Sequence, residues 1–217
     1  KAAFKIFGKD IKIKGCGRTD SKVHGICYVA NFKIETDLKE EEIKEAFNSN
    51  LPFSIRIKKV EFERDAFHSR YSAKSKVYRY LLTEFPSPFL EGYAYYVKGE
   101  LDIEKMKIAS RYIVGKHDFT SFCASGSSVK NKVREVKRIE IREERFTLDP
   151  EIKVLVIEIE ADGFLYKMAR NIVGTLIAVG RGKITPEEVK KIIETRDRKI
   201  APPTPPPYGL YLKEVKY

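Results

Sequence analysis

The sequence predicts an α+β fold in which two sheet-plus-helix halves join into one large, mostly antiparallel sheet. Blocks of strand-like and helix-like sequence occur twice along the chain, and most neighbouring strand candidates are close enough to be joined by hairpins. The 217 residues suffice for one large domain or for two small ones with a shared core. We place the joint near residues 64–73 and divide the chain into an N-terminal half, 1–68, and a C-terminal half, 69–217.

The N-terminal half contains one candidate helix and several candidate strands. Residues 38–50 place their apolar side chains on one helical face, and Asp37 precedes them as a candidate N-cap. The first residues, AAFKIF, resemble the middle of a helix, so we expect a further segment upstream of Lys1. Strands are predicted where the sequence alternates or runs apolar with β-branched side chains, over 11–16, 26–35 and 55–63.

In the C-terminal half, strands and helices follow one another. Asp102 is a candidate cap and Gly115 a candidate stop for one helix, and the segment 164–180 is apolar almost all round, which predicts a buried helix. The Pro-rich run 201–207 is interpreted as a rigid connector, since a strand-like segment follows it at once. Strands are expected at the end of 65–84 and over 133–145, 152–161 and 209–217, and helices over 102–115, 164–180 and 186–196.

The charge balance indicates a polyanionic partner. Lys and Arg number 42 against 31 Asp and Glu, a net charge of +11. A surplus of this size is typical of proteins that bind nucleic acid, although a solvated surface that keeps the protein in solution is the alternative.

Other features of the sequence narrow the class of protein. No run of eighteen apolar residues and no signal peptide occurs, which predicts a soluble protein with no membrane partner. Cys16, Cys27 and Cys123 are odd in number and have no metal-ligand spacing, as expected of reduced thiols in a cytoplasmic protein. Neither a P-loop nor a GxGxxG motif is present, so no nucleotide cofactor is expected.

Asp20 is the central candidate for chemistry. It lies in the glycine-rich stretch GCGRTDSKVHG (15–25) between two strand candidates, where a carboxylate could act as nucleophile or base if a cation kept it ionised. Arg18 could be that cation or could bind a phosphate. Two alternatives stay open: an Asx-turn in which Asp20 only bonds the backbone, and an Asp20–His24 pair for acid/base chemistry or metal binding.

Arg170 is the least expected residue of the apolar 164–180 segment. A buried arginine is costly unless a carboxylate pairs with it, and Asp20 is the partner that would account for both residues. The alternative is that this end of the helix is exposed.

Tyrosines and basic residues interleave over 70–80. Tyr71, Tyr78 and Tyr80 alternate with Arg70, Lys74, Lys76 and Arg79. Rings for stacking and charges for phosphates are what a single-stranded or flipped base requires, but a half-buried strand with a basic outer face gives the same pattern.

Five ordered blocks resemble one enzyme family. GRTDSKVHG (17–25) is similar to the GRTDxxVH signature of the tRNA pseudouridine synthases that modify the anticodon arm at tRNA nucleotides 38–40. Further matches follow in the same order in FHSRYSAKSKVYRY (67–80), HDFTSFCASG (117–126), FLYKMARNIVG (164–174) and GLYL (209–212). The resemblance implies an isomerase that converts uridine to pseudouridine without metal or organic cofactor, works as a homodimer on tRNA, and has its cleft between two α/β halves.

The same resemblance implies a role for each matching residue. Asp20 corresponds to the catalytic aspartate and Tyr78 to the tyrosine that stacks on the uracil. Arg170 corresponds to the arginine that pairs with the aspartate, Arg18 to an arginine that holds the flipped nucleotide or its backbone, and Leu210 to an apolar residue that lines the pocket.

The sequence departs from the family pattern in two places. The family's N-terminal strand, with its YDG motif, has no counterpart after Lys1, and Ser21-Lys22 stands where Ala-Gly is common. Two other functions remain open: a non-catalytic RNA-binding module of the same fold, and a nucleosidase or glycosidase that pairs Asp20 with a second carboxylate such as Asp162.

Overall fold

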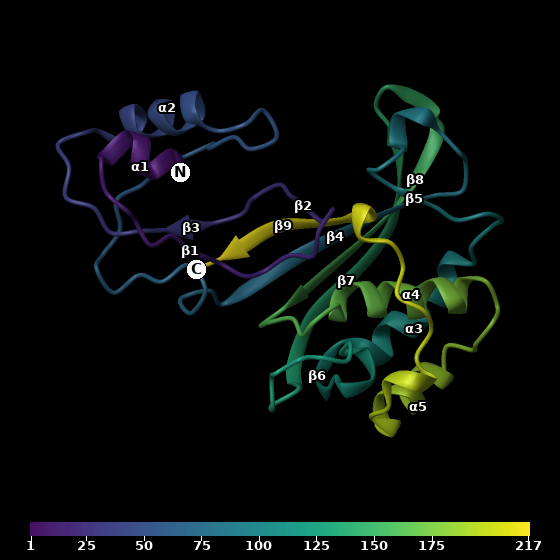
Figure 1. Ribbon diagram of the computed structural model, residues 1–217. Coiled ribbons are helices and arrows are strands. Elements are labelled where there is room, and N and C mark those ends of the chain that lie inside the picture. Colours follow the sequence, from purple (N-terminus) through teal and green to yellow (C-terminus); the bar gives the residue numbers. More distant parts are fainter. The chain divides into compact units, whose positions relative to one another are not determined.

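The computed structural model describes residues 1–217 and divides into two compact units (Figure 1). The first unit comprises Lys1–Gly17 and Val29–Ser72, and the second comprises Arg18–Tyr28 and Ala73–Tyr217. The stretch that carries Asp20 therefore folds with the second unit, although most of the first unit follows it in the sequence.

The first unit packs two helices on a short antiparallel ribbon. Its elements are α1 (Ala2–Phe7), β1 (Lys14–Gly15), β3 (Ala30–Asn31) and α2 (Glu40–Asn50). The rings of Phe7, Phe32 and Phe47 lie within 6.1 Å of one another, centroid to centroid, and form the centre of a small core with Ala3 and Ile43. The helix predicted over 38–50 is confirmed, and the first residues are helical as expected.

Most of the strand predictions for this part of the chain are wrong. Of 11–16 and 26–35, only the two residues of β1 and the two of β3 pair with each other. Residues 55–63 form no strand, because no neighbouring strand pairs with them, and side chains of α2 accept two of their backbone N–H groups instead. The Ile57 N–H donates to Asn48 Oδ1 at 2.7 Å, and the Phe62 N–H donates to Glu40 Oε1 at 2.9 Å.

The predicted cap of α2 is also wrong. The helix begins after Lys39 rather than after Asp37, and the carboxylate of Glu42 accepts the Lys39 N–H at 2.7 Å. A glutamate in the first turn thus accepts a backbone N–H at the start of the helix, the role that was expected of Asp37.

The second unit is built on a seven-stranded, mostly antiparallel sheet. The strand order is β2–β9–β4–β8–β7–β6, with β5 beside one end of β4, and only the β2–β9 and β4–β5 pairs are parallel. The α+β class predicted from the sequence is confirmed. The strands are β2 (His24–Gly25), β4 (Ser75–Thr83), β5 (Tyr95–Tyr96), β6 (Gly115–Asp118), β7 (Val133–Phe146), β8 (Asp149–Ala161) and β9 (Leu210–Lys216).

Three helices cover one face of this sheet (Figure 1). They are α3 (Ile103–Ile113), α4 (Met168–Gly180) and α5 (Glu188–Thr195), which confirms the three helices predicted here. Asp102 caps α3 as expected by accepting the Lys105 N–H at 2.9 Å, and Gly115 follows that helix with a φ of 116°. Short 3-10 turns occupy Pro88–Leu90, Thr120–Phe122, Arg198–Ile200 and Pro207–Gly209.

Helix α4 is buried along its whole length, as its apolar sequence predicts. It begins at Met168, four residues later than expected, because Lys167 adopts a left-handed φ of 59° and breaks the turn before it. None of the helices in residues 1–217 is both long and apolar enough to cross a membrane.

The opposite face of the sheet carries a charged cluster around Glu158. Its side chain is 3% exposed and accepts hydrogen bonds from Arg79, Arg142 and Lys213 at 2.7–3.1 Å. Burial raises the pKa of this carboxyl, but the hydrogen bonds from Lys213, Arg79 and Arg142 outweigh burial and lower the pKa to about 2.

Candidate active site

Asp20 lies in the loop between β1 and β2, and a tight turn fixes the backbone around it. The Val23 N–H donates to the Asp20 carbonyl at 3.1 Å, and Lys22 within that turn has a left-handed φ of 68°. The loop is anchored to the large sheet just beyond the turn, where β2 pairs with β9 and the Ile26 N–H donates to the Leu212 carbonyl at 2.9 Å.

His24 helps to hold the loop on the large sheet and does not pair with Asp20. Its ring stacks between those of Tyr93 and Tyr211, with centroids 5.3 and 4.6 Å away, and its Nε2 lies 3.0 Å from the Gly92 carbonyl oxygen. The possible Asp20–His24 pair is therefore absent from the structure. Burial, and then the neighbouring Tyr93, raise the pKa of Tyr211 to about 12.

Arg170 reaches Asp20, as the sequence suggested. Its Nη1 lies 2.6 Å from Asp20 Oδ2, and the two side chains are 10% and 25% exposed. Arg170 stands in the first turn of α4, where the chain has just left the sheet. The guanidinium offsets the cost of burying the carboxylate, while part of the Asp20 side chain stays open to solvent.

A second contact of Arg170 was not predicted from the sequence. Its Nε donates to the carbonyl of Pro205 at 2.9 Å, within the Pro-rich 201–207 segment. This segment connects α5 to β9, as expected, but it also supplies a backbone acceptor to the candidate site. No residue type predicts this contact, because the acceptor is a backbone carbonyl. The sequence indicates it only indirectly, since a Pro-rich run offers many carbonyl acceptors and few N–H donors.

Tyr78 and Leu210 lie on neighbouring strands of the sheet. Tyr78 in β4 pairs with Leu212 of β9, and Leu210 at the start of β9 pairs with Tyr80. The half-buried Tyr78 ring meets the edge of Phe164 at a centroid distance of 4.8 Å, and Leu210 is buried in the main core. Phe164 is thus a further aromatic residue beside Tyr78.

Arg18 is exposed and makes no hydrogen bond or ion pair. Its guanidinium is therefore available to a ligand, two residues from Asp20.

The tyrosines and basic residues over 70–80 do not form one continuous binding surface. Arg79 lies on the opposite face of the sheet from Tyr78, and its guanidinium is paired with Glu158.

Asp162 does not join the candidate site. Its carboxylate accepts the Glu135 N–H at 3.0 Å, at the end of the β7–β8 hairpin. Asp20 consequently stands opposite an arginine and not opposite a second carboxylate.

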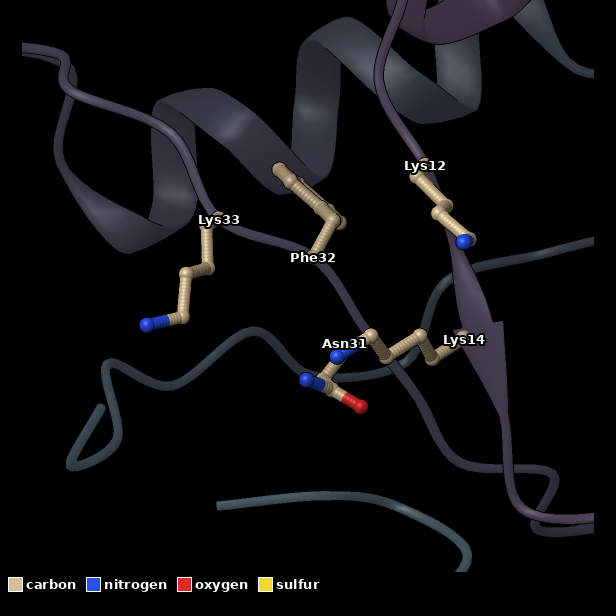
Figure 2. Close-up of a pocket in the computed structure, with 5 residues that line it drawn as sticks. All are labelled: Lys12, Lys14, Asn31, Phe32 and Lys33. Atoms are coloured by element: carbon tan, nitrogen blue, oxygen red, sulfur yellow. The ribbon is translucent and has the colours of Figure 1, made fainter. Parts of the chain in front are cut away.

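A separate basic hollow lies on the ribbon of the first unit (Figure 2). Lys12 and Lys14 stand on one side of the ribbon and Lys33 on the other, with Asn31 between them, while the Phe32 ring turns toward α2. Lys33 pairs with the exposed Asp65 at 3.1 Å, and neither Lys12 nor Lys14 has a carboxylate partner. The two free ammonium groups leave this face able to bind an anion.

Comparisons with known proteins point to one family. A family model described as tRNA pseudouridine synthase matches residues 109–217. tRNA pseudouridine synthase A of Thermoanaerobacter sp. strain X514 is 42% identical over the whole of this chain and 87% of its own length. tRNA pseudouridine synthase A 2 of Clostridium perfringens is 44% identical over the same shares, and the Bacillus licheniformis synthase A is 44% identical over 95% of this chain and 82% of its own.

Proposed function

Because the chain belongs to the tRNA pseudouridine synthase family, we propose that it converts uridine to pseudouridine in the anticodon arm of tRNA, with Asp20 as its nucleophile. The ion pair between Asp20 and Arg170 carries this proposal. A carboxylate that attacks from a partly buried site requires a cation to balance its charge. The ion pair supplies both, with Asp20 as the attacking group and Arg170 as the cation. The family model covers Arg170 but not Asp20, whereas the relatives are similar over both.

The chemistry needs a nucleophile and no group donor. Isomerisation breaks the bond from N1 of uracil to C1′ of the ribose, turns the ring and forms a bond from C5 to C1′. The proton on C5 is lost and one is gained at N1, so the atoms balance without an oxidant or a second substrate. A carboxylate oxygen of Asp20 attacks the nucleotide, either at C1′ or at C6 of the ring.

The other candidate residues would bind the extruded nucleotide. A uridine within a stem or loop must leave its stack, at a cost of a few kcal/mol, before the carboxylate can reach it. Stacking on Tyr78 and apolar contact with Leu210 would offset part of this cost, and the free guanidinium of Arg18 would hold a phosphate. The resemblance to the family motif supports these roles, as do the half-buried Tyr78 ring, the apolar Leu210 and the exposed Arg18.

The net charge of +11 supports binding to RNA. In the first unit, the exposed Lys12 and Lys14 are candidates for contacts with the RNA backbone (Figure 2). We also propose that the chain acts as a cytoplasmic homodimer, and that residues 1–68 and 69–217 form its two functional halves.

Tritium release from tRNA labelled at C5 of uridine tests the function. We expect release by the wild-type protein, no release by Asp20→Asn, and wild-type release by the matched control Asp37→Asn, an exposed aspartate in the first unit. Mapping of the product should place pseudouridine in the anticodon arm.

The affinity for tRNA distinguishes the alternatives. A catalyst that has lost its nucleophile should still bind tRNA, because Asp20 carries the wrong charge to contribute to phosphate binding. Tight binding without release by the wild type would instead indicate an RNA-binding module, and free uracil as product would indicate a nucleosidase.

A further inference from the structure

The guanidinium of Arg170 is fixed from two sides. Asp20 accepts from Nη1 at 2.6 Å, and the carbonyl of Pro205 accepts from Nε at 2.9 Å. Because these two nitrogens lie at different points of one rigid plane, the two acceptors together determine how that plane is oriented. The position of the Pro205 carbonyl is therefore part of the geometry of the candidate site.

The Pro-rich segment has almost no backbone N–H groups with which to bond to α4. Prolines have no N–H group to donate, and five of the seven residues of 201–207 are proline. What holds the segment instead is a set of side chains. The buried Asn171 follows Arg170 in α4, and its Oδ1 accepts from Thr204 Oγ1 at 2.6 Å and from Arg198 Nη2 at 3.1 Å.

Arg198 is the centre of this set. Its Nη2 also donates to the Pro202 carbonyl at 3.0 Å and to Thr204 Oγ1 at 3.2 Å, while Nη1 donates to the Ala201 carbonyl at 2.8 Å. Asn171 is fixed in turn, because its Nδ2 donates to the Phe122 carbonyl at 2.7 Å. The segment is thus tied to the same turn of α4 that carries Arg170.

Two close contacts complete the fit of the segment to the core. A Cβ atom at Gly174 would come within 2.3 Å of the Pro203 carbonyl oxygen, so only glycine allows the segment to lie this close to α4. One residue beyond Pro205, the Tyr80 hydroxyl donates to the Pro206 carbonyl at 2.6 Å. The segment is held on both sides of the carbonyl that Arg170 uses.

We propose that Arg198 and Thr204 are positioning residues for the Asp20–Arg170 pair. By binding Asn171 and the 201–207 backbone together, they hold the Pro205 carbonyl where it orients the Arg170 guanidinium, and through it the Asp20 carboxylate. The inference rests on the proposed function for its effect on catalysis, but the orientation of Arg170 is a property of the folded chain and can be measured separately.

A pair of substitutions at Thr204 isolates the hydroxyl from the bulk of the side chain. Thr204→Val keeps the shape but removes the donor to Asn171, whereas Thr204→Ser keeps the donor. We expect Thr204→Val to lower the single-turnover rate of pseudouridine formation about tenfold at saturating enzyme, with the affinity for tRNA unchanged, and Thr204→Ser to restore the rate. Lys199→Ala is the control, since Lys199 is exposed on the same 3-10 turn as Arg198.

A double-substitution cycle tests whether the effect passes through Arg170. In an Arg170→Lys background the Pro205 carbonyl no longer has a guanidinium to orient, so adding Thr204→Val should cost nothing further. A full additional tenfold loss in that background would overturn the proposal, as would a wild-type rate for Thr204→Val alone.

Nuclear magnetic resonance gives a readout that does not depend on activity. In the wild type and in Lys199→Ala, the Arg170 Nε–H should exchange slowly with solvent, because it is buried and bonded to Pro205. Faster exchange is expected in Arg198→Lys and Thr204→Val, and unchanged exchange in both would contradict the positioning role. If the wild type forms no pseudouridine, the proposed function fails while this measurement still tests the inference.

Discussion

Arg170 Nη1 lies 2.6 Å from Asp20 Oδ2, although 150 positions separate the two residues in the chain. The contact arises because the Asp20 loop is anchored to β9 through β2, while α4 begins on the helical face of the same sheet. Both residues therefore belong to one folded unit, and their geometry depends on the sheet that anchors the Asp20 loop and packs against α4.

Replacing Arg170 by lysine should impair catalysis although the charge is kept. An ammonium group is a single point of contact and cannot bond Asp20 and the Pro205 carbonyl in the fixed plane that a guanidinium provides. We expect the single-turnover rate to fall about 100-fold. Arg181→Lys, the same change at the other end of α4, should leave the rate unchanged, and equal rates for the two variants would contradict the role assigned to the pair.

Much of the second unit follows from the sequence because its signals are local. Asp102 caps α3 as predicted, and the apolar run of α4 is buried as predicted. The Arg170–Asp20 contact was predictable for a different reason. A cation in an apolar helix requires a carboxylate partner, and Asp20 was the carboxylate whose own need for a cation matched it.

The features that sequence reasoning missed depend on partners distant in the chain. Residues 55–63 alternate like a strand, yet no strand pairs with them, and the side chains of Asn48 and Glu40 accept two of their backbone N–H groups instead. The parallel pairing of β2 with β9 and the carbonyl of Pro205 beside Arg170 involve backbone groups that every residue has. Such contacts have no residue-type signature, so only the folded structure shows them.

Gly174→Ala should destabilise the protein, whereas alanine in place of a helical glycine usually stabilises it by up to about 1 kcal/mol. The added methyl would lie 2.3 Å from the Pro203 carbonyl oxygen, which is backbone and cannot turn aside. We expect a loss of about 1–3 kcal/mol in the free energy of unfolding, measured by urea denaturation.

Gly180→Ala in the same helix is the matched control for that measurement. Its Cβ would meet the sulfur of Met106 at 2.7 Å, which is part of a flexible side chain that can move. A loss at Gly180 as large as that at Gly174 would show that the close approach of the Pro-rich segment is not the cause.

Lys22→Gly should stabilise the fold. Lys22 has a φ of 68°, a conformation that costs a residue with a Cβ about 1 kcal/mol and that glycine adopts freely. We expect the free energy of unfolding to rise by up to about 1 kcal/mol, again by urea denaturation. Ser21→Gly, next to it but without a positive φ, should not stabilise, and a gain at Ser21 rather than at Lys22 would contradict the explanation.

Glu158→Gln should destabilise the protein near neutral pH and progressively less as the pH falls toward 2. The pKa of Glu158 is lowered from about 4.5 to about 2, so its ionised form stabilises the folded state by about 3 kcal/mol above pH 5. This contribution is lost as the pH falls from 5 toward 2. The variant should therefore be less stable than the wild type at pH 7, and the difference should shrink steadily in acid.

The exposed Glu104 provides the comparison for Glu158. It pairs with Lys107 on the surface of α3, where an ion pair contributes little. Glu104→Gln should change the stability by less than about 1 kcal/mol at either pH. A Glu158→Gln difference that stays constant from pH 7 to pH 3 would show that its charge is not what stabilises the sheet.

Removing Lys12 and Lys14 together should weaken tRNA binding mainly at low salt. Both side chains are exposed on the ribbon of the first unit and have no carboxylate partner, so each can release a counterion from a phosphate (Figure 2). With both changed to alanine, the slope of log affinity against log salt concentration should fall in magnitude by about 2.

The control removes the same charge at helix α2. Lys39→Ala with Lys44→Ala should leave the slope unchanged, because Glu40, Glu41 and Glu42 make phosphate binding unfavourable there. Equal slopes for the two double variants would mean that the lysines of the hollow do not contact the RNA backbone.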